Sequence, residues 1–285
     1  MTGVTAQFAS LRPLMFKIAY RMTGSVADAE DLIQDAFLKM MSAPAPDNPE
    51  AFATTVTTRL AIDHLRSARV RREEYVGEWL PTPLITADDD PAATAELHDE
   101  LSLAFLLVLE RLSPTERAAF LLREVFGYSY SDIAVIIEHS VESCRQLVTR
   151  GRARIADDRP RFEVDVKHRN DLAASFLAAC RDGDLTALER MLAEDVVFHG
   201  DGGGKVQAVA RPVHGRVQVA RFILGIMRQG TKQGGRLDPV VVNGQPGFRA
   251  VLPDGATVAV LALQIADGHI QDVFNQLNPD KLLHI

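Results

Sequence analysis

The chain has 285 residues, of which 47% are hydrophobic and 24% are charged, and its formal net charge is −7. This length favours two or three compact domains, and the composition excludes wholesale disorder. No apolar run approaches the roughly 20 residues that a membrane span needs, and residues 1–10 lack the layout of a signal peptide. The two cysteines, Cys144 and Cys180, suit neither a disulfide framework nor a metal site. We therefore expect a cytoplasmic protein without a metal, a cofactor or a membrane partner.

The distribution of charge matters more than its sum, because DNA binding requires local positive charge. Residues 75–100 contain seven acidic residues and no Lys or Arg, so the rest of the chain is neutral overall. Basic residues gather on either side of this segment, at Arg66–Arg72 and Arg145–Arg154. The pattern predicts two basic surfaces joined by an extended acidic linker.

The first segment, to about residue 74, is predicted to be helical. Apolar residues from Leu11 to Met22 recur at three- and four-residue spacing, and Thr23-Gly24-Ser25 ends that helix. A second helix should present an acidic and polar outward face, made of Asp28, Asp31, Gln34 and Asp35. After a Pro-rich loop, a third helix from about Glu50 to Arg72 should point five polar residues outward: Thr58, Arg59, Asp63, Arg66 and Arg69.

The acidic linker contains the only tryptophan of the chain, in Trp79-Leu80-Pro81. Large apolar side chains are unusual in a polar linker. Two interpretations stay open: a local packing anchor, or a contact with another domain.

Residues 101–159 have the local signals of a helix-turn-helix. Ser113-Pro114-Thr115-Glu116 and Ser129-Tyr130-Ser131-Asp132 are capping boxes that each begin a helix, and Ser140 can cap a longer basic helix. The outward face of that last helix carries Glu142, Ser143, Arg145, Gln146, Thr149 and Arg150. Arg and Gln at the start of a recognition helix can bind base edges in the major groove. The alternative is an ordinary solvated helix face.

Residues 160–285 change to an α+β pattern. Two helices, near 168–181 and 185–192, precede strand-like runs at 196–199, 205–213, 237–242, 247–252, 256–265 and 269–274, with another helix at 217–229. Turn signals join the last three strands into a meander.

Three stretches resemble known regions of the extracytoplasmic-function (ECF) sigma factors. Leu112–Tyr130, with Asp132-Ile133-Ala134 and Cys144-Arg145-Gln146-Leu147, resembles region 4, which binds the minus-35 element. Asp28–Phe37 resembles region 2.2, which docks on the polymerase β′ clamp, and Leu60–Arg66 resembles region 2.4, which reads the minus-10 element. The resemblance implies DNA contacts for the outward residues of the third and last helices and for Asn48, whose loop holds a flipped base in the family. It also implies core polymerase, through the β′ clamp and β flap, as a partner.

Two positions depart from the family pattern. Glu138 stands where a turn glycine is usual, and a left-handed conformation there would cost about 1 kcal/mol. Arg59 stands where many family members have asparagine, so minus-10 contacts do not transfer to that position.

The C-terminal part resembles the SnoaL-like, NTF2-like domain that is fused to the SigJ-like subgroup of these sigma factors. The markers are Tyr75–Pro81, Asp201-Gly202-Gly203-Gly204-Lys205 and Asn278-Pro279-Asp280-Lys281-Leu282. The resemblance implies regulation in cis and no separate anti-sigma partner. Because a triple glycine permits close approach, we expect Asp201–Lys205 to touch the linker or the helical domains, with Lys205 pairing an acidic linker residue. A plain hairpin loop is the alternative.

The combined prediction is a multidomain protein: a region 2 helical domain at 1–74, an acidic linker at 75–100, a region 4 helix-turn-helix domain at 101–159 and an NTF2-like cone at 160–285. It predicts a non-enzymatic sigma factor whose third domain docks on the helical domains at rest. The main alternative is a helix-turn-helix regulator with a ligand-sensing domain. A small ligand of the cone stays open, as does acid–base chemistry at a pocket formed by His199, His214, Asp201 and Asn275.

Overall fold

The computed structural model describes residues 2–44, 46–73, 75–86, 101–156 and 165–285. Its packing separates the chain into two units. The helical unit comprises residues 1–74 and 106–159, and the sheet unit comprises residues 75–105 and 160–285. Residues 75–86, predicted as linker, thus pack with the C-terminal part, whereas the acidic residues from Asp88 to Glu100 lie outside the described residues.

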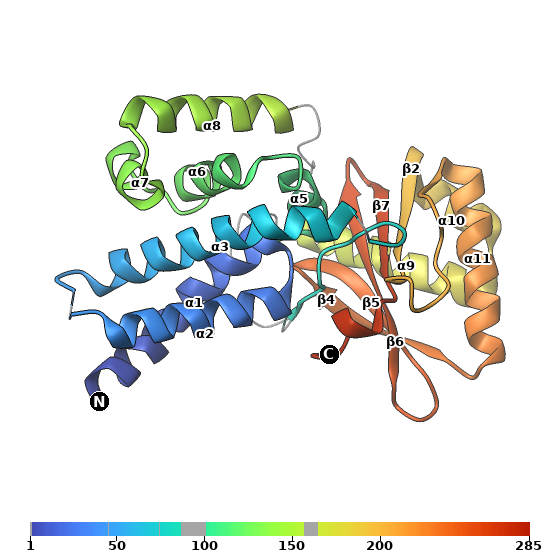
Figure 1. The fold of residues 1–285 in the computed structure, drawn as a ribbon. Coiled ribbons are helices and arrows are strands. Elements are labelled where there is room, and N and C mark those ends of the chain that lie inside the picture. The colour runs from blue at the N-terminus through green and yellow to red at the C-terminus, as the bar shows by residue number, and fades with distance from the viewer. Residues whose placement is uncertain (1, 45, 74, 87–100, 157–164) are drawn as a thin grey trace. The chain divides into compact units, whose positions relative to one another are not determined.

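The helical unit combines an N-terminal three-helix group with a helix-turn-helix (Figure 1). The first group contains α1 (Thr2–Thr23), α2 (Val26–Ser42) and α3 (Pro49–Glu73). The second contains α5 (Leu103–Leu109), α6 (Pro114–Glu124), α7 (Tyr130–Ile137) and α8 (Val141–Ile155), with the boundary between the units falling inside α5. The bounds of α3, α6, α7 and α8 agree closely with the expected helices, whereas α1 begins nine residues before Leu11 and α5 was not predicted.

Serine caps determine where the helices of the helix-turn-helix begin. Ser113 and Ser129 both form capping boxes, with Glu116 and Asp132 respectively, and Ser140 accepts a hydrogen bond from the Ser143 N–H. Each cap satisfies backbone donors that the first helical turn leaves free. Helix α7 ends at Glu138, which has φ 57° and ψ 48°. The predicted left-handed residue is therefore present without a glycine.

Helix α3 is buried along two faces. One face packs on the core of the first group, where Met15, Ile33, Ala36 and Ala53 are buried. The other face contacts α6 and α7. Thr58 is 0% exposed as a result, so the prediction that it faces outward is wrong: the periodicity revealed one apolar face and could not reveal that a second helix pair covers another.

The sheet unit contains one seven-stranded sheet in the order β1-β4-β5-β6-β7-β2-β3. Only β2 and β7 run parallel; the other neighbours are antiparallel. The strands are β1 (Ile85–Thr86), β2 (Leu192–Asp201), β3 (Val213–His214), β4 (Arg236–Val242), β5 (Gln245–Val251), β6 (Thr257–Ala266) and β7 (His269–Gln276).

Most of these strands match the expected ones, but the strand expected at 205–213 is wrong, since only Val213–His214 is extended and paired. Gly203 and Gly204 adopt φ values of 60° and 69°, and the Lys205 N–H bonds the Gly202 carbonyl. The chain therefore turns where a strand was expected to begin.

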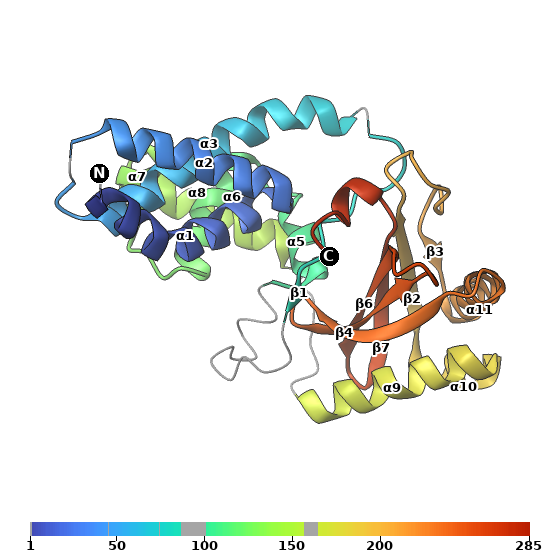
Figure 2. The ribbon, with the colours of Figure 1, turned by 90° about the horizontal axis from the view of Figure 1, so that it is seen from below.

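Helices lie along this curved sheet (Figure 2). They are α9 (Val166–Asp182), α10 (Leu185–Met191) and α11 (Arg216–Lys232), and a 3-10 turn η1 (Pro279–Lys281) follows β7. Their apolar faces enclose a core with the inner face of the sheet, where Phe176 stacks on Phe248 at 5.8 Å between ring centroids. Two sets of helices followed by an α+β domain agree with the predicted multidomain architecture.

Within the described ranges, no helix has the length and apolarity to cross a bilayer.

Candidate nucleic-acid surfaces and linker site

Helix α8 presents the polar face that was predicted for a recognition helix. Cys144, Leu147 and Val148 are buried, and they fix the orientation of the helix. On the opposite face Ser143 is half-buried and five residues are exposed: Glu142, Arg145, Gln146, Thr149 and Arg150. This arrangement leaves donors for base edges near the start of the helix and cations further along it.

Two arginines of α8 also reach back to the start of α6. Arg154 and Arg150 lie 2.5 and 3.3 Å from the carboxylate of Glu116, which is only 3% exposed. Burial opposes ionisation of Glu116, but hydrogen bonds from Ser113 and the two arginines outweigh it and lower the pKa of this carboxyl. The capping box thus also orients the basic end of α8.

Arg59 of α3 binds the end of α7. Its Nε donates to the Ile136 carbonyl at 2.8 Å and its Nη2 donates to the Val135 carbonyl at 2.8 Å. Its Nη1 lies 2.7 Å from a carboxylate oxygen of Glu138. The carbonyls at a helix end have no partner within the helix and carry partial negative charge. Arg59 therefore supplies a cationic cap for α7, and the two residues that depart from the family pattern contact one another.

Further contacts hold the three-helix group to the helix-turn-helix. Arg117 of α6 is 3% exposed, and its Nη1 donates to the Met22 carbonyl at 2.6 Å and pairs with Glu110 at 2.7 Å. Burial lowers the pKa of Arg117 to about 9. The hydroxyl groups of Thr54 and Tyr128 lie 2.9 Å apart. Hydrogen bonds from buried polar groups thus join the two parts of the helical unit.

The other predicted DNA-contacting residues of the first group have separate positions. Asp63 and Arg66 are exposed on α3 and lie 3.5 Å from each other. Asn48 is exposed and its Oδ1 accepts a hydrogen bond from the Ala51 N–H, so it also starts α3. The side chain of Arg69 lies outside the described residues.

The predicted polymerase-binding face of α2 is exposed in most of its length. Asp31, Gln34 and Asp35 are exposed. Asp28 differs, because it lies 3.4 Å from the His64 ring of α3. The face therefore offers two exposed carboxylates and an exposed amide to a basic surface.

Asp201 forms the centre of a buried polar site in the sheet unit. It is 0% exposed, and its carboxylate accepts hydrogen bonds from the Tyr75 hydroxyl at 2.6 Å and the Leu80 N–H at 2.9 Å. Lys281 and Gln276 donate to it at 2.7 and 3.2 Å. A buried carboxylate requires this number of donors to remain charged. Residues 75–80 are thereby fixed to strands β2 and β7.

Lys281 completes the site. Its ammonium also donates to the Leu80 carbonyl at 2.6 Å and lies 4.4 Å from the centroid of the Trp79 ring. Asn278 donates to the Tyr75 hydroxyl at 2.9 Å. Burial and the bond to Asp201 raise the pKa of Tyr75, so its hydroxyl stays protonated and acts as a donor. Here Trp79-Leu80-Pro81 anchors residues 75–86 to the sheet unit.

Among the described residues, Lys205 pairs outside the linker. Its ammonium lies 2.6 Å from Asp280, which follows β7, and among the linker residues that the structure describes the only acidic one, Glu78, binds elsewhere. Glu78 is therefore not the partner of Lys205, and the other acidic linker residues, from Asp88 to Glu100, lie outside the described residues. The glycines provide the close approach instead, because a Cβ on Gly204 would lie 3.0 Å from the Val76 Cβ and one on Gly203 would overlap Asn278.

A second set of polar contacts, absent from the sequence predictions, joins Glu78 to the sheet. His199 Nδ1 lies 2.7 Å from Glu78 and Nε2 lies 3.2 Å from Asp272. Burial of the ring opposes its protonation, but hydrogen bonds to Asp272 and Glu78 outweigh burial and raise the pKa of His199 to about 9. A protonated ring between two carboxylates thus holds the linker.

The sequence predictions also missed the structural role of Asn243. With φ 53°, followed by Gly244 at φ 74°, it forms the turn between β4 and β5. Its Oδ1 accepts from the Leu84 N–H and its Nδ2 donates to the Leu101 carbonyl, both at 2.8 Å. The Asn-Gly pair is a strong hairpin signal, but nothing in sequence indicates that its side chain fixes both ends of residues 84–101.

The pocket expected from His199, His214, Asp201 and Asn275 is not assembled. Asn275 lines a cavity in the sheet unit, whereas His199 and Asp201 point to the linker on the opposite face of β2. His214 is absent from the lining of that cavity. The acid–base interpretation therefore loses its geometric basis.

Comparison with known proteins agrees with this architecture. Residues 7–71 match the Sigma-70 region 2 family and residues 102–155 match Sigma-70, region 4. The chain is 38% identical to the ECF RNA polymerase sigma factor SigJ of Mycobacterium tuberculosis, over 97% of this chain and 92% of that protein. It is 33% identical to the probable ECF RNA polymerase sigma factor SigI of the same species, over 98% and 94% of the two chains.

The crystal structure of M. tuberculosis SigJ superposes on 97% of both chains with a TM-score of 0.78 and 33% identity. Regions 2 and 4 occur in this order and are followed by the α+β domain, and the similarity to SigJ extends over nearly the whole chain. The chain therefore belongs to the ECF sigma factors of the sigma-70 family, and it is an RNA polymerase sigma factor for transcription initiation rather than an enzyme.

Proposed function

We propose that α3 reads the minus-10 element, that α8 reads the minus-35 element, and that the exposed acidic face of α2 docks on the β′ clamp of core polymerase while the region 4 helices meet the β flap. The support is the exposure of Arg145 and Gln146 at the start of α8 and of Asp31 and Asp35 on α2. Arg-to-guanine and Gln-to-adenine contacts need exposed side chains of this kind. The protein would act in the cytoplasm, where polymerase works.

The packed helical unit represents the resting form of the protein in this proposal. The two promoter elements are separated by about 25 base pairs, or ~85 Å of B-DNA. Helices α3 and α8 have 25 and 15 residues, which correspond to about 37 and 22 Å, so even end to end they would not span that distance. Arg59 cannot hold α7 while both elements are bound, and the two regions must separate on polymerase.

The sheet unit controls this separation in cis, according to the proposal, by holding residues 75–86 of the connection between the regions. The single observation that carries this idea is Asp201, buried among donors from Tyr75, Leu80 and Lys281. A linker fixed in this way has less reach than a free one. No separate anti-sigma factor is needed for such control.

Run-off transcription on fragmented genomic DNA with purified core polymerase tests the proposal. New discrete start sites should appear with the wild-type chain, and more transcript should appear with Asp201→Asn, which weakens the linker site. The double variant Asp31→Arg/Asp35→Arg should abolish transcription and polymerase binding. A matched charge reversal on exposed acids of α9, Asp171→Arg/Asp182→Arg, should leave both unchanged. Start sites that persist with the α2 double variant would contradict the polymerase-binding face, and unchanged activity of Asp201→Asn would contradict control by the linker site.

A further inference from the structure

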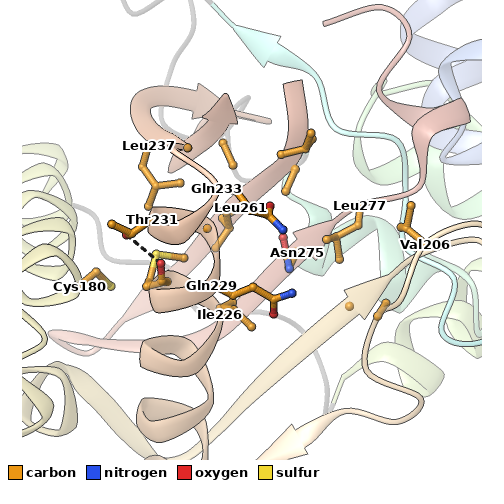
Figure 3. Close-up of a pocket in the computed structure, with 18 of the residues that line it drawn as sticks. Cys180, Val206, Ile226, Gln229, Thr231, Gln233, Leu237, Leu261, Asn275 and Leu277 are labelled. Carbon is orange, nitrogen blue, oxygen red and sulfur yellow. Dashed lines mark hydrogen bonds between the residues drawn. The ribbon is translucent and has the colours of Figure 1, made fainter. Parts of the chain in front are cut away.

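The sheet unit contains a cavity, partly open to solvent, that its linker-binding role does not use. The cavity has a volume of about 760 Å³, which is within the usual range for small-molecule sites. It lies between α11 and the inner face of the sheet, and Figure 3 shows Ile226, Leu237, Leu261 and Leu277 around it. Most of its lining is aliphatic or aromatic, including Phe198 and Phe222.

One polar side chain inside the cavity has an unused acceptor. Asn275 of β7 is 6% exposed, and its Oδ1 has no hydrogen-bond partner among the described residues. A buried amide oxygen without a donor is unfavourable, because it has lost its hydrogen bond to water and gained none in return. Asn275 points from the strand into the space that the apolar residues surround (Figure 3). A donor group on a bound molecule would remove that cost.

The charged groups of the lining restrict the occupant. Arg181 and Arg236 are both exposed, and Arg236 is already paired with Asp238 at 3.0 Å. No carboxylate is among the lining residues. Burial raises the pKa of Cys180 to about 12, so this lining thiol is a weak nucleophile at neutral pH. An ionised group deep in the cavity would lose its hydration without gaining a partner.

The cavity and the linker site are opposite faces of the same two strands. Residues alternate along a strand, and β2 places Phe198 and Gly200 in the cavity but Asp201 at the linker. Strand β7 places Asn275 in the cavity, and the next residue, Gln276, donates to Asp201. A molecule in the cavity would therefore contact the strands that hold residues 75–80.

From these observations we propose that the cavity is a binding site for an uncharged, largely apolar small molecule whose hydroxyl or N–H group donates a hydrogen bond to Asn275 Oδ1. The apolar lining supplies affinity through burial, and Asn275 selects molecules that carry a donor, because a molecule without one leaves the buried oxygen unpaired.

A matched pair of probes tests the donor requirement directly. 2-Naphthol and 2-methylnaphthalene have nearly the same shape, but only the first carries a hydroxyl. Titration of the full-length chain, followed by probe fluorescence, should show 2-naphthol binding at least threefold more tightly. Asn275→Leu should remove this preference and retain 2-methylnaphthalene binding. Ala259→Phe, which fills the cavity, should weaken both probes at least tenfold, and Asn170→Leu on an exposed position of α9 should change neither.

Several outcomes would overturn the proposal. Equal affinities for the two probes in the wild-type chain would refute the role of Asn275. Binding that survives Ala259→Phe would place the probes elsewhere, and absence of binding by both would refute the site. If Asn275→Leu does not fold, the probe preference of the wild-type chain and the affinities of the Ala259→Phe variant still test the proposal. The assay contains neither polymerase nor DNA, so its failure leaves the transcription experiment intact, and the reverse also holds.

Discussion

Replacement of Arg59 by alanine should loosen the contact between regions 2 and 4. The side chain donates two hydrogen bonds to carbonyls at the end of α7 and pairs with Glu138. Each hydrogen bond from a partly buried cation contributes about 1 kcal/mol net. The side chains of Arg59 and Glu138 are 41% and 71% exposed, so the ion pair adds well under 1 kcal/mol. The total is about 2 kcal/mol, equivalent to a ~30-fold fall in the ratio of packed to separated regions.

Spin labels on exposed positions of α2 and α8, at Lys39→Cys and Ala153→Cys, report this ratio through pulsed electron resonance distances. The native thiols Cys144 and Cys180 are buried, so they should not be labelled. Arg59→Ala should shift population from a short to a long distance. Glu138→Gln should produce a much smaller shift, because it retains both carbonyl contacts. The control is Arg145→Ala, because Arg145 lies on α8 and is not bound by α3.

An unchanged distance distribution in Arg59→Ala would refute the reasoning. It would mean that Arg117 and the apolar contacts hold the regions together and that the cap on α7 contributes nothing measurable. An equal shift in Glu138→Gln would instead assign the contact to the ion pair.

Three further predictions concern the linker site and the DNA surface. Asp201→Asn leaves buried Lys281 without its counter-charge and should lower the free energy of unfolding by about 3 kcal/mol in urea titrations, whereas Asp238→Asn, at a partly exposed pair, should cost less than about 1 kcal/mol. The pKa of His199 is raised to about 9, so its protonated form stabilises the fold. This contribution is complete below about pH 6.5 and is lost as pH rises through about 9, a change of about 3 kcal/mol in the free energy of unfolding that His199→Gln should abolish. An NMR titration midpoint near 6.5 for His199 would contradict the buried ion pairs. Arg145→Ala should weaken binding to the minus-35 element by about 1–3 kcal/mol and lower the preference of the protein for that sequence. Arg152→Ala should weaken binding to all DNA sequences by a similar amount. Equal losses of affinity for specific and random DNA with Arg145→Ala would exclude a base contact.

The sequence alone determined the local structure. Capping boxes at Ser113 and Ser129, the cap at Ser140 and the apolar spacing of α8 specify where helices begin and which side faces solvent, because these signals act over only three or four residues. Turn signals predicted the meander of β5, β6 and β7, and the resemblance, with its usual turn glycine at this position, predicted the left-handed Glu138. Motif order along the chain was enough to predict the family.

Only the tertiary structure decided which surfaces meet. Thr58 and Arg59 were both predicted to face outward, yet Thr58 is buried and Arg59 binds the end of α7. Likewise, Asp201 and Asn275 were both predicted as pocket residues. In the paired strands β2 and β7, Asp201 binds the linker and Asn275 lines the cavity. Because side chains alternate along a strand, neighbouring residues lie on opposite faces of the sheet. Which face packs on the linker and which lines the cavity depends on contacts between residues more than a hundred positions apart.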